Sequence, residues 1–275
     1  MSANTPVAAF FDLDKTIIAT SSAFAFGKEF LHNGMITRQE AWDLYLSKAQ
    51  YMLMGQSSEK MDSTRDALAQ MVAGWEVDDI QRITRDTLRE VVAPAIYAEA
   101  RELIDAHKAK GHHIIIISAS AKILVEPIAQ ELGVDTVVAT EMAIENGKLT
   151  GEITRYLKGE AKAEAVRQFA ADHSFDLDAS FAYSDSATDI PMLELVGNPV
   201  AVNPDRALKK HALANGWQAR TFKNPEPLIQ MPNAREVGIG AGVIAGVTAL
   251  AVAGVLIARA VSGSGKGAGE KRRSA

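Results

Sequence analysis

The chain has 275 residues and a hydrophobic content of 47%, enough to bury a large core and to carry an inserted domain. It contains no cysteine, which excludes disulfides and thiolate metal sites. The net charge is −5 for the whole chain and +4 for residues 237–275, which leaves −9 for residues 1–236 and argues against a nucleic-acid-binding surface.

The first segment with a chemical signature lies close to the start of the chain. Residues 7–11 are apolar and have the length of a buried strand, and Asp12, Asp14 and Thr16 follow them. Open α/β sheets place ligands at the carboxyl ends of their strands. Two carboxylates at i and i+2 repel each other unless a cation or a proton lies between them, and oxygen ligands suit Mg²⁺. A simple turn is the alternative interpretation, because aspartate is common where chains bend.

The next part of the chain is predicted to be helical and is too long for a single crossover connection. Four helices are predicted there, over residues 21–33, 37–53, 58–75 and 77–92. Thr37 and Glu40 have the spacing of a capping box. A further long helix is predicted from Pro94 to Lys110, where glycine stops it and returns the chain to the sheet.

A second buried strand is predicted over residues 113–117, and Ser118, Ala119 and Ser120 follow it. A serine at this point is otherwise an ordinary N-cap for the next helix. The pattern then predicts a helix over 121–132, a strand over 136–139, and a hairpin over 142–153. Asn146 and Gly147 mark a type I′ turn in that hairpin.

The last part of the predicted core contains a lysine and a second pair of acids. Lys158 opens an amphipathic helix, at the end where the helix dipole disfavours a cation, which indicates that another group holds it there. Solvated surface is the alternative. Residues 181–184 predict a short strand, which Asp185 and Asp189 follow. Further helices are predicted over 189–196 and 204–214, with a strand over 199–202.

These segments, in this order, resemble the four motifs of the haloacid dehalogenase (HAD) superfamily, of which the first is D-x-D-x-T. The resemblance implies an α/β fold, a doubly wound parallel, Rossmann-like core made of residues 1–20 and 94–230. The resemblance also implies a helical type C1 cap over residues 21–93, inserted after the first strand, as in subfamily IB, which includes the phosphoserine phosphatases. The cap is expected to close over the phosphate and exclude water. One position departs from the family pattern, because Ser184 stands where glycine usually precedes the first acid of the fourth motif.

The resemblance also implies a reaction and its catalytic residues. Asp12 is expected to attack phosphorus and form an aspartyl phosphate, and Asp14 to act as the general acid and base. The Ser118 hydroxyl and the neighbouring amides, that of Ala119 among them, are expected to bind the phosphoryl oxygens. Lys158 is expected to neutralise the nucleophile and the phosphate.

The cofactor implied by the family is Mg²⁺. Its expected ligands are carboxylate oxygens of Asp12 and Asp185 and the backbone carbonyl of Asp14, with waters and phosphate completing an octahedron. Asp189 is expected to position Lys158.

The substrate is less well defined than the reaction. Phosphoserine phosphatases carry an acid seven positions after the second aspartate of the first motif, and here that position is Ser21. Without this acid a substrate ammonium group lacks its clearest partner, and we expect Ser21 and Ser22 to cap the first helix of the cap. The expected substrate is a small phosphorylated metabolite or a phosphorylated lipid or lipid precursor, with phosphoserine as an alternative. One alternative reaction is transfer of the phosphoryl group to an acceptor other than water. An alternative function is that of a non-catalytic membrane adaptor with this fold.

The far end of the chain predicts membrane attachment. Residues 237–258 carry no charge and are long enough to span a bilayer, and Gly238, Gly242 and Gly246 form a small-residue face suited to helix self-association. Residues 231–236 form the linker and residues 259–275 a basic tail. We expect a single-pass protein with a cytoplasmic catalytic domain, although the positive-inside tendency opposes translocation of the tail. A flexible tail and an in-plane or re-entrant segment are the alternatives.

Overall fold

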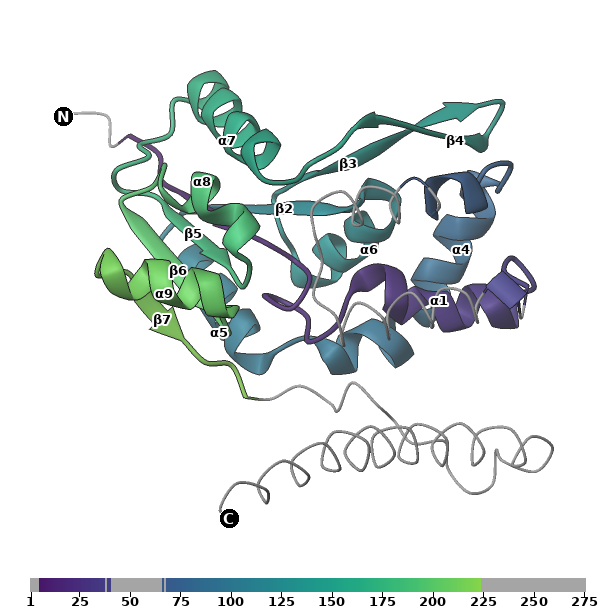
Figure 1. Ribbon diagram of the computed structural model, residues 1–275, viewed down its shortest axis with the longest axis horizontal. Helices are drawn as coiled ribbons and strands as arrows, with labels where there is room; N and C mark the ends of the chain where they lie inside the picture. Colours follow the sequence, from purple (N-terminus) through teal and green to yellow (C-terminus); the bar gives the residue numbers. More distant parts are fainter. Residues whose placement is uncertain (1–4, 38, 41–65, 67, 224–275) are drawn as a thin grey trace, which may run out of the picture. The chain divides into compact units, whose positions relative to one another are not determined.

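The core is built on a seven-stranded sheet with the order β4-β3-β2-β1-β5-β6-β7 (Figure 1). A computed structural model describes residues 5–37, 39–40, 66 and 68–223. The strands are β1 (Ala8–Phe11), β2 (His113–Ala121), β3 (Thr136–Glu145), β4 (Lys148–Arg155), β5 (Phe181–Ser184), β6 (Asn198–Val202) and β7 (Gln218–Arg220). All neighbouring strands are parallel except β3 and β4, which form an antiparallel hairpin. The prediction of a parallel α/β core is confirmed.

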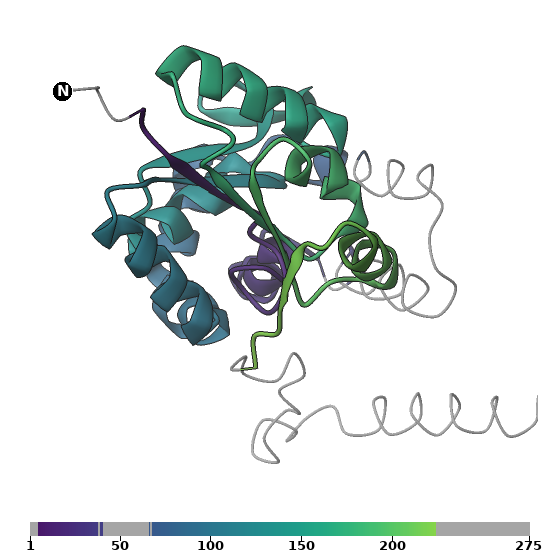
Figure 2. The same ribbon diagram turned by 90° about the vertical axis from the view of Figure 1, so that its left-hand side faces the viewer.

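Helices cover both faces of this sheet, as expected for a doubly wound domain (Figure 2). The side chains of β1 alternate between two apolar cores, with Ala9 and Phe11 in one and Ala8 and Phe10 in the other. The first core includes residues of α5 (Ala98–Ala109) and α6 (Lys122–Leu132), and the second residues of α7 (Glu160–His173), α8 (Ile190–Leu193) and α9 (Arg206–Ala214). Both faces of β1 are therefore buried, which explains its continuous apolar sequence.

Helices form most of the described part of the segment between β1 and β2, with non-helical stretches at 33–37 and 72–76. It contains α1 (Ser22–His32), α4 (Val77–Thr87), a π-helical turn (Leu88–Val92) and a 3₁₀ turn (Ala93–Ala95). The helix predicted over 37–53 lies mostly outside the described residues. Of the helix predicted over 58–75, residues 66 and 68–75 are described; 66 and 68–71 are helical, whereas 72–75 are not. The capping box is confirmed, because the Thr37 N–H donates to the Glu40 carboxylate at 2.7 Å and the Glu40 N–H donates to the Thr37 hydroxyl at 3.2 Å.

The long helix predicted from Pro94 is shorter than expected and starts at Ala98. Ile96 and Tyr97 are extended instead. The Tyr97 N–H donates to the Ile17 carbonyl oxygen at 3.0 Å, and Ile96 forms an isolated bridge with Ile18. The two chain segments that connect the core to the inserted helices therefore pair with each other, which is a tertiary contact that local sequence does not reveal.

Several later elements match their predictions, with changed boundaries. The helix after β2 is α6, and Gly133 ends it in the left-handed conformation. Asn146 and Gly147 both have positive φ between β3 and β4, as a type I′ turn requires. The helix predicted over 189–196 is a 3₁₀ turn (Ala187–Asp189) followed by the short α8, and the edge strand β7 was not predicted.

Within the described ranges, none of the helices has the length and apolar character needed to cross a membrane. The segment 237–258 lies outside those ranges, as do the linker over 231–236 and the basic tail. The membrane helix and the glycine face remain predictions.

Candidate active site

Three neighbouring strands bring the predicted side chains to one edge of the sheet. Asp12 comes directly after β1, Asp185 directly after β5, and Ser118 lies in the last part of β2. β1 pairs in parallel with both β2 and β5, and the Asp12 N–H continues the pairing by donating to the Tyr183 carbonyl oxygen at 2.9 Å. Because parallel strands end at the same edge, these residues meet at the carboxyl ends of the central strands, as predicted.

The lysine of this site is Lys162. Its Nζ donates to Asp12 Oδ1 at 2.7 Å and to Asp189 Oδ2 at 2.8 Å. All three side chains are almost fully buried. Lys162 thus takes the place predicted for Lys158, and the expectations that Lys158 neutralises the nucleophile and that Asp189 positions Lys158 are corrected accordingly.

The start of α7 explains this difference between the two lysines. The helix begins at Glu160, so Lys158 precedes it, whereas Lys162 lies in its first turn. Lys162 shares the buried face with Ala163 and Val166. A lysine there is costly to bury unless it is paired, and the two carboxylates provide that pairing.

Gly159 sets the direction in which α7 leaves the preceding loop. It has φ 58° and ψ −124°, a conformation that side chains strongly disfavour. Its carbonyl oxygen accepts a hydrogen bond from the Lys162 N–H at 3.0 Å. The glycine therefore lets the first helical turn place the lysine against the carboxylates.

Ser184, the departure from the family pattern, has a defined role in the structure. This fully buried serine donates its hydroxyl to Asp189 Oδ2 at 2.7 Å and accepts from the Ser186 N–H at 3.2 Å. A glycine could not make either side-chain contact. The hydroxyl and Lys162 together hold Asp189 in place.

Asp14 lies between the core and the first inserted helix. Its Oδ1 accepts a hydrogen bond from the Ser22 N–H at 2.7 Å, and its Oδ2 accepts one from the Ser120 hydroxyl at 2.5 Å. Ser21 occupies the N-cap position of α1, but its side chain makes no capping hydrogen bond. The expectation that serine side chains cap this helix is therefore corrected, since the Asp14 carboxylate meets its first N–H.

Ser118 and Ala119 have different contacts at the end of β2. The Ser118 oxygen accepts from the Ser120 N–H at 3.1 Å, and the Ala119 carbonyl oxygen accepts from the Thr140 hydroxyl at 2.7 Å. Among the described residues, no acceptor is bonded to the Ser118 hydroxyl hydrogen. That hydrogen is therefore available for a phosphoryl oxygen.

The site carries more negative than positive charge. Burial raises the pKa of Asp12 to about 8, with further contributions from Asp189, Asp185 and Asp14, while Lys162 opposes the shift. Burial also raises the pKa of Asp185 to about 6. Burial lowers the pKa of Lys162, but Asp12 and Asp189 outweigh it and raise the pKa above its usual value.

This charge balance fits a hard cation. Asp12 and Asp185 supply carboxylate oxygens from adjacent strand ends, and Asp14 has a backbone carbonyl in the same loop, which is the oxygen-rich donor set that Mg²⁺ prefers. In the described part of the chain, no three His, Cys, Asp or Glu side chains cluster as a metal site by themselves. The expected set needs two such side chains and one carbonyl, with water and substrate completing it.

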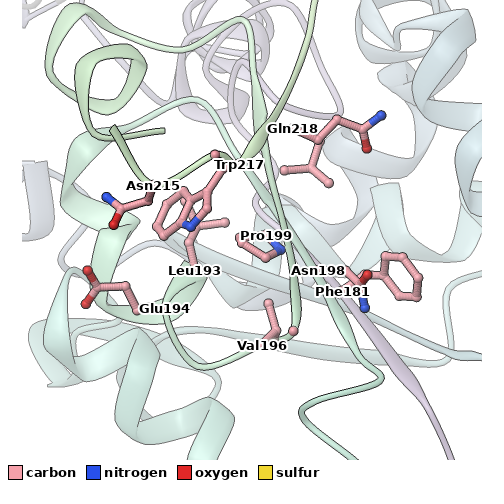
Figure 3. Close-up of a pocket in the computed structure, with 12 residues that line it drawn as sticks. Phe181, Leu193, Glu194, Val196, Asn198, Pro199, Asn215, Trp217 and Gln218 are labelled. Carbon is pink, nitrogen blue, oxygen red and sulfur yellow. The ribbon is translucent and has the colours of Figure 1, made fainter. Parts of the chain in front are cut away.

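A hollow on the described part of the chain lies away from these residues. It has a volume of about 530 Å³ and lies where β5, β6 and β7 begin, next to Trp217, Glu194 and Asn215 (Figure 3). Asp12 and Asp185 follow the opposite ends of their strands. The chemistry of the sheet therefore belongs to the carboxyl edge, not to this hollow.

The roles of four residues of the site were not predicted from the sequence. The hydrogen bonds of Ser22 and Ser120 to Asp14 and of Ser184 to Asp189 were not expected, and Lys158 was expected in the place that Lys162 takes. For Lys162 a signal was present, because it falls on the apolar face of the predicted helix with Val166 and Ala170. No comparable signal marks Ser22 or Ser120, whose contacts join residues 98 and 106 positions apart.

Comparison with known proteins gives a family match. Residues 9–194 match the model of the haloacid dehalogenase-like hydrolases. A protein of Mycobacterium tuberculosis named as a probable phosphatase is 43% identical over 91% of this chain and 88% of its own length. A second protein of that organism, named as a phosphoserine phosphatase, is 34% identical over 86% of this chain and 79% of its own length.

A solved structure has a similar fold. A protein of unknown function from Bordetella pertussis superposes with a TM-score of 0.70 and 26% identity, over 79% of this chain and 99% of its own.

Proposed function

We propose, since this chain belongs to the haloacid dehalogenase-like hydrolase family, that it is a Mg²⁺-dependent phosphatase that hydrolyses a phosphomonoester through an aspartyl phosphate. The observation that carries this proposal is the buried ion pair of Asp12 with Lys162 at the carboxyl end of β1. A carboxylate in that position can attack phosphorus only if nearby positive charge offsets the repulsion between two anions. The names of the two mycobacterial relatives agree with phosphatase chemistry.

The first step forms the phosphoenzyme. A carboxylate oxygen of Asp12 forms a bond to phosphorus while the bond from phosphorus to the leaving oxygen breaks. Protonated Asp14 gives its proton to that oxygen, so the alcohol leaves neutral. Lys162 and the Ser118 hydroxyl hold the charge that spreads over the phosphoryl oxygens.

The second step releases phosphate. Asp14, now a carboxylate, takes a proton from water as the water oxygen attacks phosphorus. The bond between phosphorus and Asp12 breaks, and both carboxyl groups return to their starting states. Asp189, held by Ser184, keeps Lys162 in position during both steps.

The metal would be held by the carboxylates of Asp12 and Asp185 and the carbonyl of Asp14. When bound, Mg²⁺ supplies positive charge that draws the phosphoryl group to the nucleophile. The acidic residues that raise the pKa of Asp12 are also the ones whose repulsion a cation offsets.

The test is hydrolysis of p-nitrophenyl phosphate with Mg²⁺ and with EDTA, by the wild type and by Asp12→Asn. We expect metal-dependent turnover, loss of turnover in the variant, and a phosphoenzyme that can be trapped in the wild type. Full activity of Asp12→Asn would refute the nucleophile assignment. Full activity in EDTA would refute the metal requirement.

Phosphoserine is the second candidate for the substrate. It is favoured by the relative named as a phosphoserine phosphatase, at 34% identity. Against it, Ser21 replaces the acid expected to bind the amino group. Hydrolysis rates for a set of phosphomonoesters distinguish phosphoserine from other substrates. A strong preference for phosphoserine would overturn the argument from Ser21.

Membrane attachment through residues 237–258 is a separate part of the proposal, supported by their uncharged sequence. The full chain is expected to stay with membranes after alkaline extraction, whereas a chain that ends at Asn233 is expected to be released. A reporter fused after Ala275 tests the orientation, and a cytoplasmic signal would rule out a simple tail anchor. Activity of the shortened chain on lipid phosphates, compared with the full chain in bilayers, tests a lipid substrate.

A further inference from the structure

The acid/base residue Asp14 is held by two serines from different parts of the fold. The Ser22 N–H, at the start of α1, donates to Oδ1 at 2.7 Å, and the Ser120 hydroxyl, in β2, donates to Oδ2 at 2.5 Å. A third bond links the serines, because the Ser22 hydroxyl donates to the Ser120 oxygen at 2.8 Å. The three residues form a closed ring of hydrogen bonds.

From this ring we propose that Ser120, supported by Ser22, is a positioning residue that fixes the Asp14 carboxyl group for proton transfer to and from the substrate oxygen. The inference rests on the proposed phosphatase function. Two donors on two oxygens prevent the carboxyl group from rotating about its last side-chain bond. General acid catalysis requires such a fixed group within hydrogen-bond reach of the leaving oxygen.

The hydrogen bonds of the two serine hydroxyls distinguish positioning of Asp14, by Ser120, from phosphate binding, by Ser118. A serine hydroxyl has one hydrogen to donate, and that of Ser120 is used on Asp14. The hydroxyl hydrogen of Ser118 has no bonded acceptor within the described ranges. Ser118 can therefore donate to a phosphoryl oxygen, whereas Ser120 could do so only by releasing Asp14.

The ring also connects the acid/base residue to the inserted helices. Ser22 is completely buried, and its N–H is the first of α1. An acceptor there is favoured by the helix dipole, so Asp14 stabilises the helix while the helix holds Asp14. The position of α1 and that of the catalytic carboxyl group are thus set by the same contact.

A leaving-group comparison tests the proposal. An alkyl phosphate needs its leaving oxygen protonated, whereas the p-nitrophenolate ion leaves without help. We expect Ser120→Ala to lower kcat/KM about 10–100-fold for an alkyl phosphate, because it removes a hydrogen bond to the Asp14 carboxyl group, which becomes charged as it gives up its proton. For p-nitrophenyl phosphate we expect a loss of less than about threefold. The parameter kcat/KM is used because it reports the steps up to release of the alcohol.

Three variants complete the test. Ser120→Thr retains the hydroxyl and is expected to restore the alkyl phosphate activity. Ser22→Ala removes the bond between the serines but leaves the backbone contact with Asp14, so its loss is expected to be smaller. Ser118→Ala is the matched comparison, with a similar loss expected for both substrates because phosphoryl binding is common to them.

Equal losses on the two substrates in Ser120→Ala, or no rescue by threonine, would overturn the positioning role. Asp12→Asn separates this failure from failure of the proposed function. If Asp12→Asn is inactive and Ser120→Ala shows no leaving-group dependence, the phosphatase function stands and the role of Ser120 falls. If Asp12→Asn is fully active, the proposed function itself fails.

Discussion

Replacement of Lys162 by methionine tests the central ion pair of the site. Methionine has a similar length and no charge, so the change leaves Asp12 and Asp189 as two buried carboxylates without their cation. At an effective dielectric constant of about 20, the contacts at 2.7 and 2.8 Å each contribute about 6 kcal/mol of attraction before desolvation is subtracted. Removal of one partner from a buried pair typically costs a net of about 3–5 kcal/mol.

The net cost of about 3–5 kcal/mol also determines the expected loss of activity. If Lys162 stabilises the transition state by about 3–5 kcal/mol, Lys162→Met lowers kcat/KM by about 10²–10⁴-fold. The loss of folding stability is expected to be smaller at neutral pH, because Asp12 can take up a proton when its cation is removed. The assay is steady-state hydrolysis of p-nitrophenyl phosphate, with urea unfolding of the same preparations.

Lys158→Met is the matched control, since the sequence pattern alone favours that lysine. It precedes α7, and we expect it to retain kcat/KM to within about tenfold. A larger loss in Lys158→Met than in Lys162→Met, with both variants folded by circular dichroism, would refute the assignment of Lys162.

Three further predictions concern charge, backbone and hydrogen bonding in the same site. The pKa of Asp12 is raised from 3.8 to about 8, so between these pH values the folded metal-free protein binds more protons than the unfolded chain. In EDTA, the free energy of unfolding of the wild type in urea should therefore fall by about a few kcal/mol from pH 4 to pH 8, relative to that of Asp12→Asn. A rise in the relative stability of the wild type over this pH range would contradict the raised pKa. Gly159→Ala should lower the free energy of unfolding by about 1–3 kcal/mol, measured by heat or urea, because residue 159 has a positive φ. The same variant should lower kcat, because Lys162 is displaced. Unchanged stability would show that the turn tolerates a side chain. Ser184→Ala should cost about 1–3 kcal/mol, because Asp189 loses a buried donor, whereas an unchanged urea midpoint would mean that the hydroxyl adds nothing.

Much of the core was predictable because its signals are local. Continuous apolar runs identified β1 and β2, since strands buried on both faces need apolar side chains at every position. The turn at Asn146 and Gly147 was predictable because few residues adopt positive φ at two successive positions. Asp12 and Asp185 could be placed at one edge because each directly follows such a strand.

Other features depend on contacts between segments far apart in the chain. The start of α5 at Ala98 depends on the pairing of the preceding residues with Ile17 and Ile18, which removes them from the predicted helix. The choice of lysine depends on where α7 begins and on which face of it meets the sheet.

The sequence by itself determined the type of chemistry, through carboxylates that follow buried strands, and the class of fold, through the order of strands and helices. Only the tertiary structure decided that Lys162 pairs with Asp12 and that Ser22 and Ser120 hold Asp14. The physical reason is that hydrogen bonds and ion pairs depend on distances of about 3 Å between atoms. Periodicity places a residue on a face, but the packing of α1 and α7 against the sheet sets those distances.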